Sequence, residues 1–195
     1  MATFPSASSP TTPVSALPTV DTPPTLTDYA RVSVGLTLFA GWLTFVVQRP
    51  WTHTVRPAEL LGPLLALIAL VFVAWAVTLV FRNYAILRGI TSGAYYRRYE
   101  GELPPEWVER PARTFNNLMQ VPPMFYLVCL LMLHTGRVDA AQLVLAWTFV
   151  AARYAHACVY SMWNHLPSRF GTFLASFVTL IVLYVRFALQ TADLW

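Results

Sequence analysis

Four polar residues follow one another at helical spacing inside an apolar run in the C-terminal half of the chain. Arg153 is followed by His156, Tyr160 and Asn164 at i+3, i+7 and i+11, so one helical face carries all four. Arg153 lies about ten residues before the end of this run, which is roughly 15 Å at a rise of about 1.5 Å per residue. A guanidinium at that depth in an apolar medium needs a partner or a wet cavity.

A second polar stripe precedes another apolar stretch. Arg113, Asn117 and Gln120 stand at i, i+4 and i+7 and also share one helical face. Arg169 opens the last apolar stretch, and no acidic residue lies within the four longest apolar runs. If these segments are helices that present these residues on the same side of the membrane, an anionic ligand would supply the missing negative charge. The pattern therefore predicts an anion-binding site built from three helices.

Each of these residues, taken singly, also has a simpler interpretation. Any one of these arginines, and Arg169 at a helix start in particular, can extend toward water or cap backbone carbonyls. Tyr160 is typical of an anchor at a membrane interface, and His156 of a packed, hydrogen-bonded side chain. Taken together, however, three segments contribute positive charges and no negative one. This favours an anion-binding site over separate structural roles for each residue.

The composition indicates that a bilayer surrounds these segments. Of the 195 residues, 56% are hydrophobic and 11% are charged, whereas soluble domains carry about 25% charged residues. A water-soluble fold of this size could not bury so much apolar surface. All thirteen basic residues are arginine, and they cluster beside the apolar runs. Membrane topology therefore explains the net charge of +4 better than nucleic-acid binding does.

Four apolar runs are long enough to cross the membrane, and a fifth is at the lower limit. The four occupy residues 60–81, 117–133, 140–163 and 169–189, and the fifth occupies residues 32–48. We expect the fifth to cross, with a re-entrant or surface-lying helix as the alternative. Gly89 should end the helix that starts at residue 60, and Pro122 with Pro123 should kink the next helix or mark its entry. The predicted fold class is all-α, a transmembrane four-helix bundle with an additional N-terminal membrane helix at residues 29–50.

The polar segments predict an orientation in the membrane. Residues 82–112 form the one substantial polar loop, and six arginines lie between Arg82 and Arg113, so the positive-inside rule places this loop in the cytoplasm. Residues 1–28 are rich in Pro, Ser and Thr and are predicted to be a disordered tail, because they cannot bury enough apolar area to offset their ordering entropy. The C-terminus is then outside, and the tail is inside if residues 32–48 cross.

Other classes of site find little support in the sequence. Cys129 and Cys158 lie inside apolar runs, without a CxxC motif and without His or Asp at metal-ligand spacing. We therefore expect two small buried hydrophobic side chains and no metal site. No internal repeat and no pair of broken helices suggests a transporter.

Two stretches of the chain resemble a known family. Residues 109–126, ERPARTFNNLMQVPPMFY, look like the signature of the MAPEG superfamily, the membrane-associated proteins of eicosanoid and glutathione metabolism. That signature contains an Arg, an Asn four residues later and a Glu three residues after that. Residues 152–160, ARYAHACVY, with Arg169 nine residues after the tyrosine, are similar to the third and fourth helices of the same proteins. The resemblance covers about residues 58–190 and is closest to the bacterial branch, which implies a bacterial inner membrane.

The resemblance implies a ligand and an assembly. Family members are typically four-helix subunits that form homotrimers and bind glutathione between neighbouring subunits, near the cytoplasmic side. It implies that Arg113 and Asn117 hold the carboxylates and polar backbone of glutathione, and that His156 and Tyr160 shape the cavity. Arg169 matches the arginine proposed to stabilise the glutathione thiolate. Arg169 and Tyr160 are thus the candidate catalytic residues, and the candidate cofactor-binding residues are Arg113, Asn117, Gln120, Arg153 and His156.

The chain departs from the family pattern at two positions. Gln120 stands where the family has Glu, which keeps the shape and loses the charge, and Phe170 stands where some active members have a small polar residue. Two functions are therefore considered. The first is a glutathione-dependent transferase or peroxidase acting on lipophilic electrophiles that arrive from the membrane lipids. The alternative, favoured by both departures and by the extra helix, is a non-catalytic membrane scaffold that binds lipid or a protein partner.

Overall fold

The computed structural model describes residues 23–98 and 101–192, and within these ranges every regular element is a helix. In chain order the helices are α1 (Leu26–Gln48), α2 (Leu61–Leu87), α3 (Gly93–Arg98), α4 (Glu106–Leu118), α5 (Pro122–Thr135), α6 (Ala140–Cys158) and α7 (Leu166–Thr191). A 3₁₀ turn, Pro57–Leu60, leads into α2, and a π-helical turn, Val159–Trp163, extends α6. Five spans are long and apolar enough to cross a membrane: α1, α2 with its leading turn, α4 with α5, α6 with its π turn, and α7. The predicted all-α fold with an additional N-terminal helix is confirmed.

Capping side chains and glycines set several helix ends. Thr25 and Asp28 form a capping box at the start of α1, in which each side chain accepts a hydrogen bond from the backbone of the other residue. Asp139 and Gln142 form the same box at the start of α6. Gly89, with φ 67°, follows the end of α2 as predicted. Glycine adopts this left-handed conformation without the steric penalty of a Cβ atom.

The third span is broken between α4 and α5. Proline lacks an N–H and its ring clashes with the preceding helical turn, so helical hydrogen bonding cannot run through Pro122 and Pro123. α4 ends at Leu118 and α5 begins anew at Pro122. The kink or entry expected at these prolines is therefore a complete break, which frees carbonyl groups at the end of α4.

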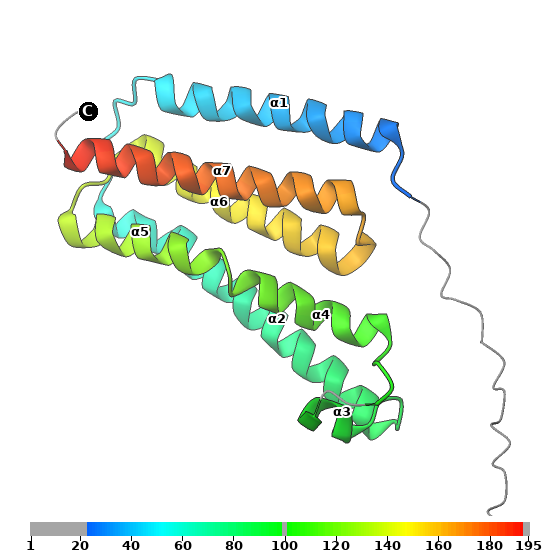
Figure 1. The fold of residues 1–195 in the computed structure, drawn as a ribbon. Coiled ribbons are helices and arrows are strands. Elements are labelled where there is room, and N and C mark those ends of the chain that lie inside the picture. The colour runs from blue at the N-terminus through cyan, green and yellow to red at the C-terminus, as the bar shows by residue number, and fades with distance from the viewer. Residues whose placement is uncertain (1–22, 99–100, 193–195) are drawn as a thin grey trace, which may run out of the picture.

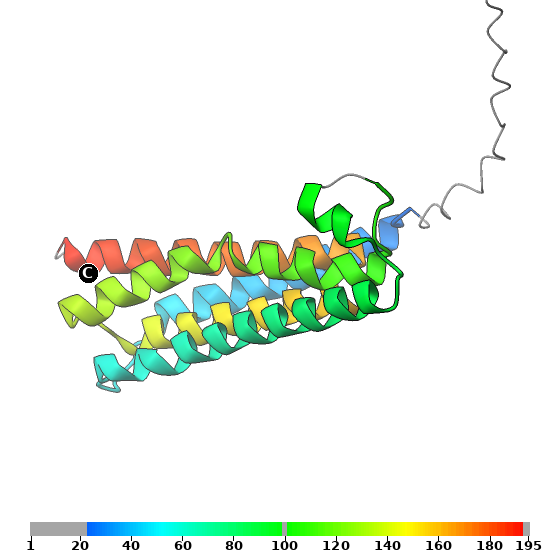
Figure 2. The ribbon, with the colours of Figure 1, turned by 90° about the horizontal axis from the view of Figure 1, so that it is seen from below.

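The spans lie alongside one another, so their connections gather at two ends (Figures 1 and 2). One end, called the loop end below, holds the start of α1, the end of α2, α3, the start of α4 and the connection from α6 to α7 (Figure 1). α1 runs beside α7, with Val32 against Gly171. In the core, Phe125 of α5 and Phe149 of α6 have no exposed area and stack with their ring centroids 4.5 Å apart.

The segment 82–112, predicted to be a loop, is largely helical. α2 continues to Leu87, α3 follows, and α4 already begins at Glu106. The polar side chains of this segment stabilise the helices by pairing with one another: Arg82 Nη2 lies 3.3 Å from Glu109 Oε2, and the Tyr96 hydroxyl donates to the same carboxylate at 3.3 Å. Low hydropathy therefore marks the end of the apolar part of α2, and not the end of the helix.

The predicted disordered tail, residues 1–28, lies mostly outside the described residues, which begin at residue 23. Its last part is not a tail, because the capping box at Thr25 starts α1 at Leu26. α1 therefore begins three residues before the predicted boundary at residue 29.

Much apolar side-chain surface is exposed on the outside of the spans, as expected of helices that contact lipid. Cys129 is buried, as predicted, but the same prediction for Cys158 is wrong. Cys158 lines an apolar crevice of about 250 Å³ between α2, α4 and α6, and no described helix covers its thiol.

Candidate functional site

Arg153 has no exposed area and lies between α4 and α7. Its Nη2 donates to the Asn117 carbonyl at 3.2 Å, and its Nη1 donates to Ser176 Oγ at 3.4 Å. Its guanidinium carbon lies 5.9 Å from the centre of the Phe173 ring. The carboxylates that form ion pairs on these helices do so with other arginines.

The break in the third span explains how the Arg153 guanidinium is stabilised. Asn117 is the residue before the last of α4, and the C-terminal carbonyls of a helix carry a partial negative charge of roughly −0.5. The Asn117 carbonyl accepts the Gln120 N–H at 3.3 Å and also the Arg153 guanidinium, so Arg153 caps the end of α4. In this structure Arg153 reaches no cavity, so its role as a ligand-binding residue stays a prediction.

His156 joins α6 to the start of α7. Its Nδ1 lies 3.1 Å from the Arg169 carbonyl oxygen and 3.1 Å from Thr172 Oγ1. A carbonyl oxygen can only accept, so Nδ1 carries the proton in this contact and donates it. His156 Nε2 is buried and has no hydrogen-bond partner within the described chain. The imidazole thus fixes the backbone at Arg169 and leaves one nitrogen free.

Arg169 and Tyr160 are in direct contact. The guanidinium carbon of Arg169 lies 3.7 Å from the centre of the Tyr160 ring, within the range of a cation–π contact. Arg169 Nη1 donates to Asn164 Oδ1 at 2.7 Å, and the Asn164 amide in turn donates to Glu106 Oε1 at 3.2 Å. One amide therefore connects Arg169 at the start of α7 with Glu106 at the start of α4.

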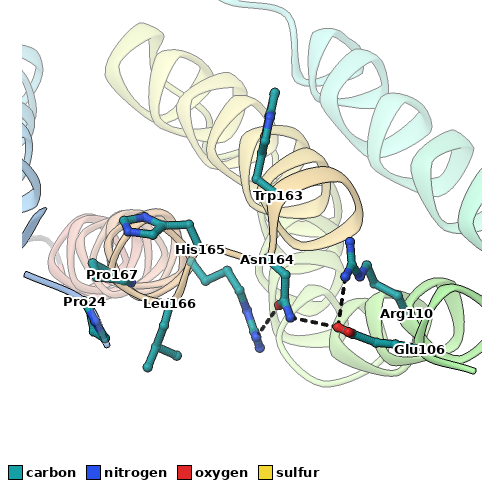
Figure 3. A pocket seen from close by; sticks show the side chains of 9 residues that line it. Pro24, Glu106, Arg110, Trp163, Asn164, His165, Leu166 and Pro167 are labelled. Carbon is teal, nitrogen blue, oxygen red and sulfur yellow. Dashed lines mark hydrogen bonds and ion pairs between the residues drawn. The ribbon is translucent and has the colours of Figure 1, made fainter. Parts of the chain in front are cut away.

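The position of Asn164 depends on the π-helical turn. The Asn164 N–H donates to the Val159 carbonyl five residues earlier, at 2.8 Å. Asn164 itself has φ 52° and ψ 23°, the left-handed conformation that asparagine tolerates better than most residues. The turn ends α6 and directs the Asn164 side chain toward Glu106 (Figure 3).

A cavity of about 450 Å³ opens at the loop end beside Arg169 (Figure 3). Three parts of the chain enclose it: Pro24 ahead of α1, the first turn of α4, and the connection from α6 to α7. Its remaining lining residues are Glu106, Arg110, Trp163, Asn164, His165, Leu166, Pro167 and Arg169. Volumes of this order are typical of small-molecule sites, which occupy about 300–1,000 Å³.

The structure brings together only part of the predicted site. The Asn117 carbonyl joins Asn117 to Arg153, and His156, Tyr160 and Arg169 form a second group through the contacts above. The Phe173 ring contacts both, with its centre 5.9 Å from the Arg153 guanidinium carbon and 6.0 Å from the centre of the His156 ring. Arg113 on α4 and Gln120 in the turn after it, by contrast, are exposed and form no side-chain hydrogen bond or ion pair with other described residues. Asn117 contributes only its backbone carbonyl to these contacts. Its side-chain Oδ1 is buried and has no hydrogen-bond partner within the described chain.

Among the cavity residues that sequence reasoning missed, Glu106 and Arg110 carry a charge. Both lie on the same face of α4 as Arg113, at i−7 and i−3. Continuing the polar stripe toward the N-terminus would have found them, had residues 106–112 been interpreted as helix.

The sequence matches a protein-family model over most of the bundle. The model described as MAPEG family matches residues 60–189, about two thirds of the chain. The matched range contains every predicted site residue and leaves out α1. No curated protein and no solved structure gives a significant match to this chain. The family match confirms the resemblance inferred from residues 109–126 and 152–160.

Proposed function

Because the chain belongs to the MAPEG family of membrane proteins, we propose that it is a glutathione-dependent transferase or peroxidase acting on lipophilic electrophiles. The observation that carries the proposal is the environment of Arg169. Its guanidinium stacks on Tyr160, donates to a neutral amide beside a cavity, and forms no ion pair with a described carboxylate. A guanidinium in this situation is suited to bind an anion.

The free polar atoms near Arg169 fit a ligand with several hydrogen-bonding groups. Arg169 Nε, His156 Nε2 and Asn117 Oδ1 are all buried and lack a hydrogen-bond partner within the described chain. Buried polar atoms are almost always paired in native proteins, so unpaired atoms on these three predicted site residues favour a bound molecule or water there. A tripeptide with two carboxylates, amides and a thiol offers the complementary donors and acceptors.

Glutathione supplies a thiol whose sulfur, once deprotonated, attacks an electrophilic carbon or a peroxide oxygen. Arg169 favours the thiolate electrostatically, because a thiol with an ordinary pKa of about 8.5 is mostly protonated at neutral pH. Tyr160 holds the guanidinium in place from one side. His156 holds the backbone of Arg169 through its Nδ1. These contacts would orient the cation before the ligand binds.

The proposal includes the assembly and the orientation in the membrane. Arg113 and Gln120 are exposed in the single chain, as expected of residues that complete a site between neighbouring subunits of a homotrimer. The arginine-rich segment 82–113 supports a cytoplasmic loop end in a bacterial inner membrane. Glutathione would then reach the cavity from the cytoplasm, and the lipophilic substrate would come from the bilayer.

A non-catalytic membrane protein that binds lipid or a protein partner is the second candidate function. Gln120 favours it, because this side chain is exposed and cannot balance an arginine or an ammonium group. α1 lies outside the matched range and covers part of α7. This addition to the family fold also favours a non-catalytic function.

Conjugation of an aromatic halide by the purified protein with glutathione tests the enzyme proposal. We expect wild-type activity, and a loss in kcat/KM on the order of 10²-fold in Arg169→Ala, the size typical for removal of one transition-state donor. Arg97→Ala removes an exposed arginine from the same end of the molecule and should leave activity unchanged. Calorimetry with glutathione on wild type and Arg113→Ala measures binding apart from chemistry. An inactive wild type, or an Arg169→Ala variant as active as wild type, contradicts the proposal.

A further inference from the structure

The cavity at the loop end is lined by a negatively charged side chain as well as by positively charged ones. Glu106 lines it from the first turn of α4, and Arg169 lines it from the start of α7. Only the Asn164 amide separates the two, because it accepts from Arg169 at 2.7 Å and donates to Glu106 at 3.2 Å. A ligand in this cavity therefore meets both signs of charge a short distance apart.

The Glu106 carboxylate has capacity left for a ligand. Its two hydrogen bonds, from Arg110 at 2.9 Å and from Asn164, both end on Oε1. Oε2 receives no hydrogen bond from the described chain, and the side chain is 52% exposed. A carboxylate offers about four acceptor sites, and an exposed i,i+4 ion pair such as that with Arg110 is weak, so Oε2 can accept a further charged donor.

The location of Glu106 relates it to the proposed ligand site. Glu106 lies two helical turns before Arg113 on the same face of α4, so it extends the stripe of Arg113, Asn117 and Gln120 to the cavity. Asn164, directly after the π-helical turn that extends α6, reaches the cavity four residues after Tyr160. The two polar stripes therefore meet at the cavity, with Glu106 as the carboxylate between them.

We infer that Glu106 accepts the ammonium group of a zwitterionic ligand whose anionic group lies at Arg169, so that the cavity selects for a free amino group. This inference rests on the proposed function, because it takes glutathione as the ligand. Hydrogen bonds between an ammonium group and a carboxylate are charge-assisted and among the strong ones in proteins.

Calorimetry on the purified full-length chain tests the inference with two probes. They are glutathione and its deaminated analogue, in which hydrogen replaces the ammonium group. The wild type should bind glutathione at least about tenfold more tightly than the analogue. In Glu106→Gln this ratio should fall to nearly one, while the affinity for the analogue stays the same. Glu102→Gln, which removes an exposed carboxylate outside the cavity, should keep the wild-type ratio.

The possible results separate the inference from the proposed function. If the wild type binds neither probe, both the proposed function and the inference are overturned. If it binds both probes equally, or if Glu106→Gln keeps the preference for glutathione, the inference alone is overturned. A purely structural role for Glu106 at the start of α4 would weaken binding of both probes together, leaving their ratio at the wild-type value, and so would also count against it.

Discussion

The contact between α1 and α7 at Gly171 allows a quantitative test of whether the additional helix packs on the bundle. A Cβ atom built on Gly171 lies 2.8 Å from Cγ1 of Val32, closer than real Cβ contacts come. Valine has one strongly preferred rotamer in a helix, so Val32 cannot simply turn away. In Gly171→Ala, α1 and α7 must therefore separate locally. A Cβ built on Gly41, also in α1, meets nothing within 4 Å, which makes Gly41→Ala the matched control.

Two opposing effects determine how much Gly171→Ala changes the free energy of unfolding. Replacing glycine by alanine in a helix stabilises the folded state by roughly 0.5–1 kcal/mol, and this is the whole effect expected for Gly41→Ala. Gly171→Ala gains the same amount but also overpacks the interface, which costs about 1–3 kcal/mol. Its net effect should be a destabilisation of up to about 2.5 kcal/mol. With Val32→Ala as background the clash disappears, and Gly171→Ala should then stabilise the protein.

The assay is reversible unfolding in mixed detergent micelles, followed by far-UV circular dichroism, for the four members of the Val32/Gly171 cycle. The expected coupling free energy between the two positions is about 1–3 kcal/mol, whereas independent sites add within about 0.5 kcal/mol. If Gly171→Ala behaves like Gly41→Ala, or if the two substitutions are additive, α1 does not rest on α7 and the reasoning is refuted.

Two further predictions concern the site. Gln120→Glu should raise the affinity for glutathione about five- to tenfold by calorimetry, because the added carboxylate can balance an arginine of the site; an unchanged affinity would mean that the cavity serves another ligand. Asn164→Gly should keep the thermal unfolding temperature, since glycine readily adopts φ 52°, but should lower kcat/KM roughly tenfold, because Arg169 loses the hydrogen bond that orients it. A glycine variant with full activity would show that this bond is dispensable.

The helices and much of the site follow from simple patterns in the sequence. Runs of apolar residues located the spans, Gly89 marked the end of α2, and 3.6-residue spacing placed Arg153, His156 and Tyr160 on one face of α6. The contact of Tyr160 with Arg169 also agrees with this reasoning, because a short connection brings the end of one helix next to the start of the following one.

Three features of the structure could not be predicted from these sequence patterns. The π-helical turn at Val159–Trp163 differs from an α-helix by a single residue in hydrogen bonding, which periodicity does not detect. The start of α4 at Glu106 was hidden because polarity was taken to indicate a loop. Capping of a backbone carbonyl was an alternative for each arginine, but the sequence does not show that Arg153 is the one that caps or that the end of α4 supplies the carbonyl.

The carbonyl that receives Arg153 differs from an acidic side chain in one physical respect. A carboxylate in that place would gain and lose a proton as the acidity of the surroundings changed, and the buried arginine would lose its counter-charge at low pH. The Asn117 carbonyl at the end of α4 does not titrate. The break in the third span thus gives Arg153 a hydrogen-bond acceptor whose partial charge does not depend on the acidity of the surroundings.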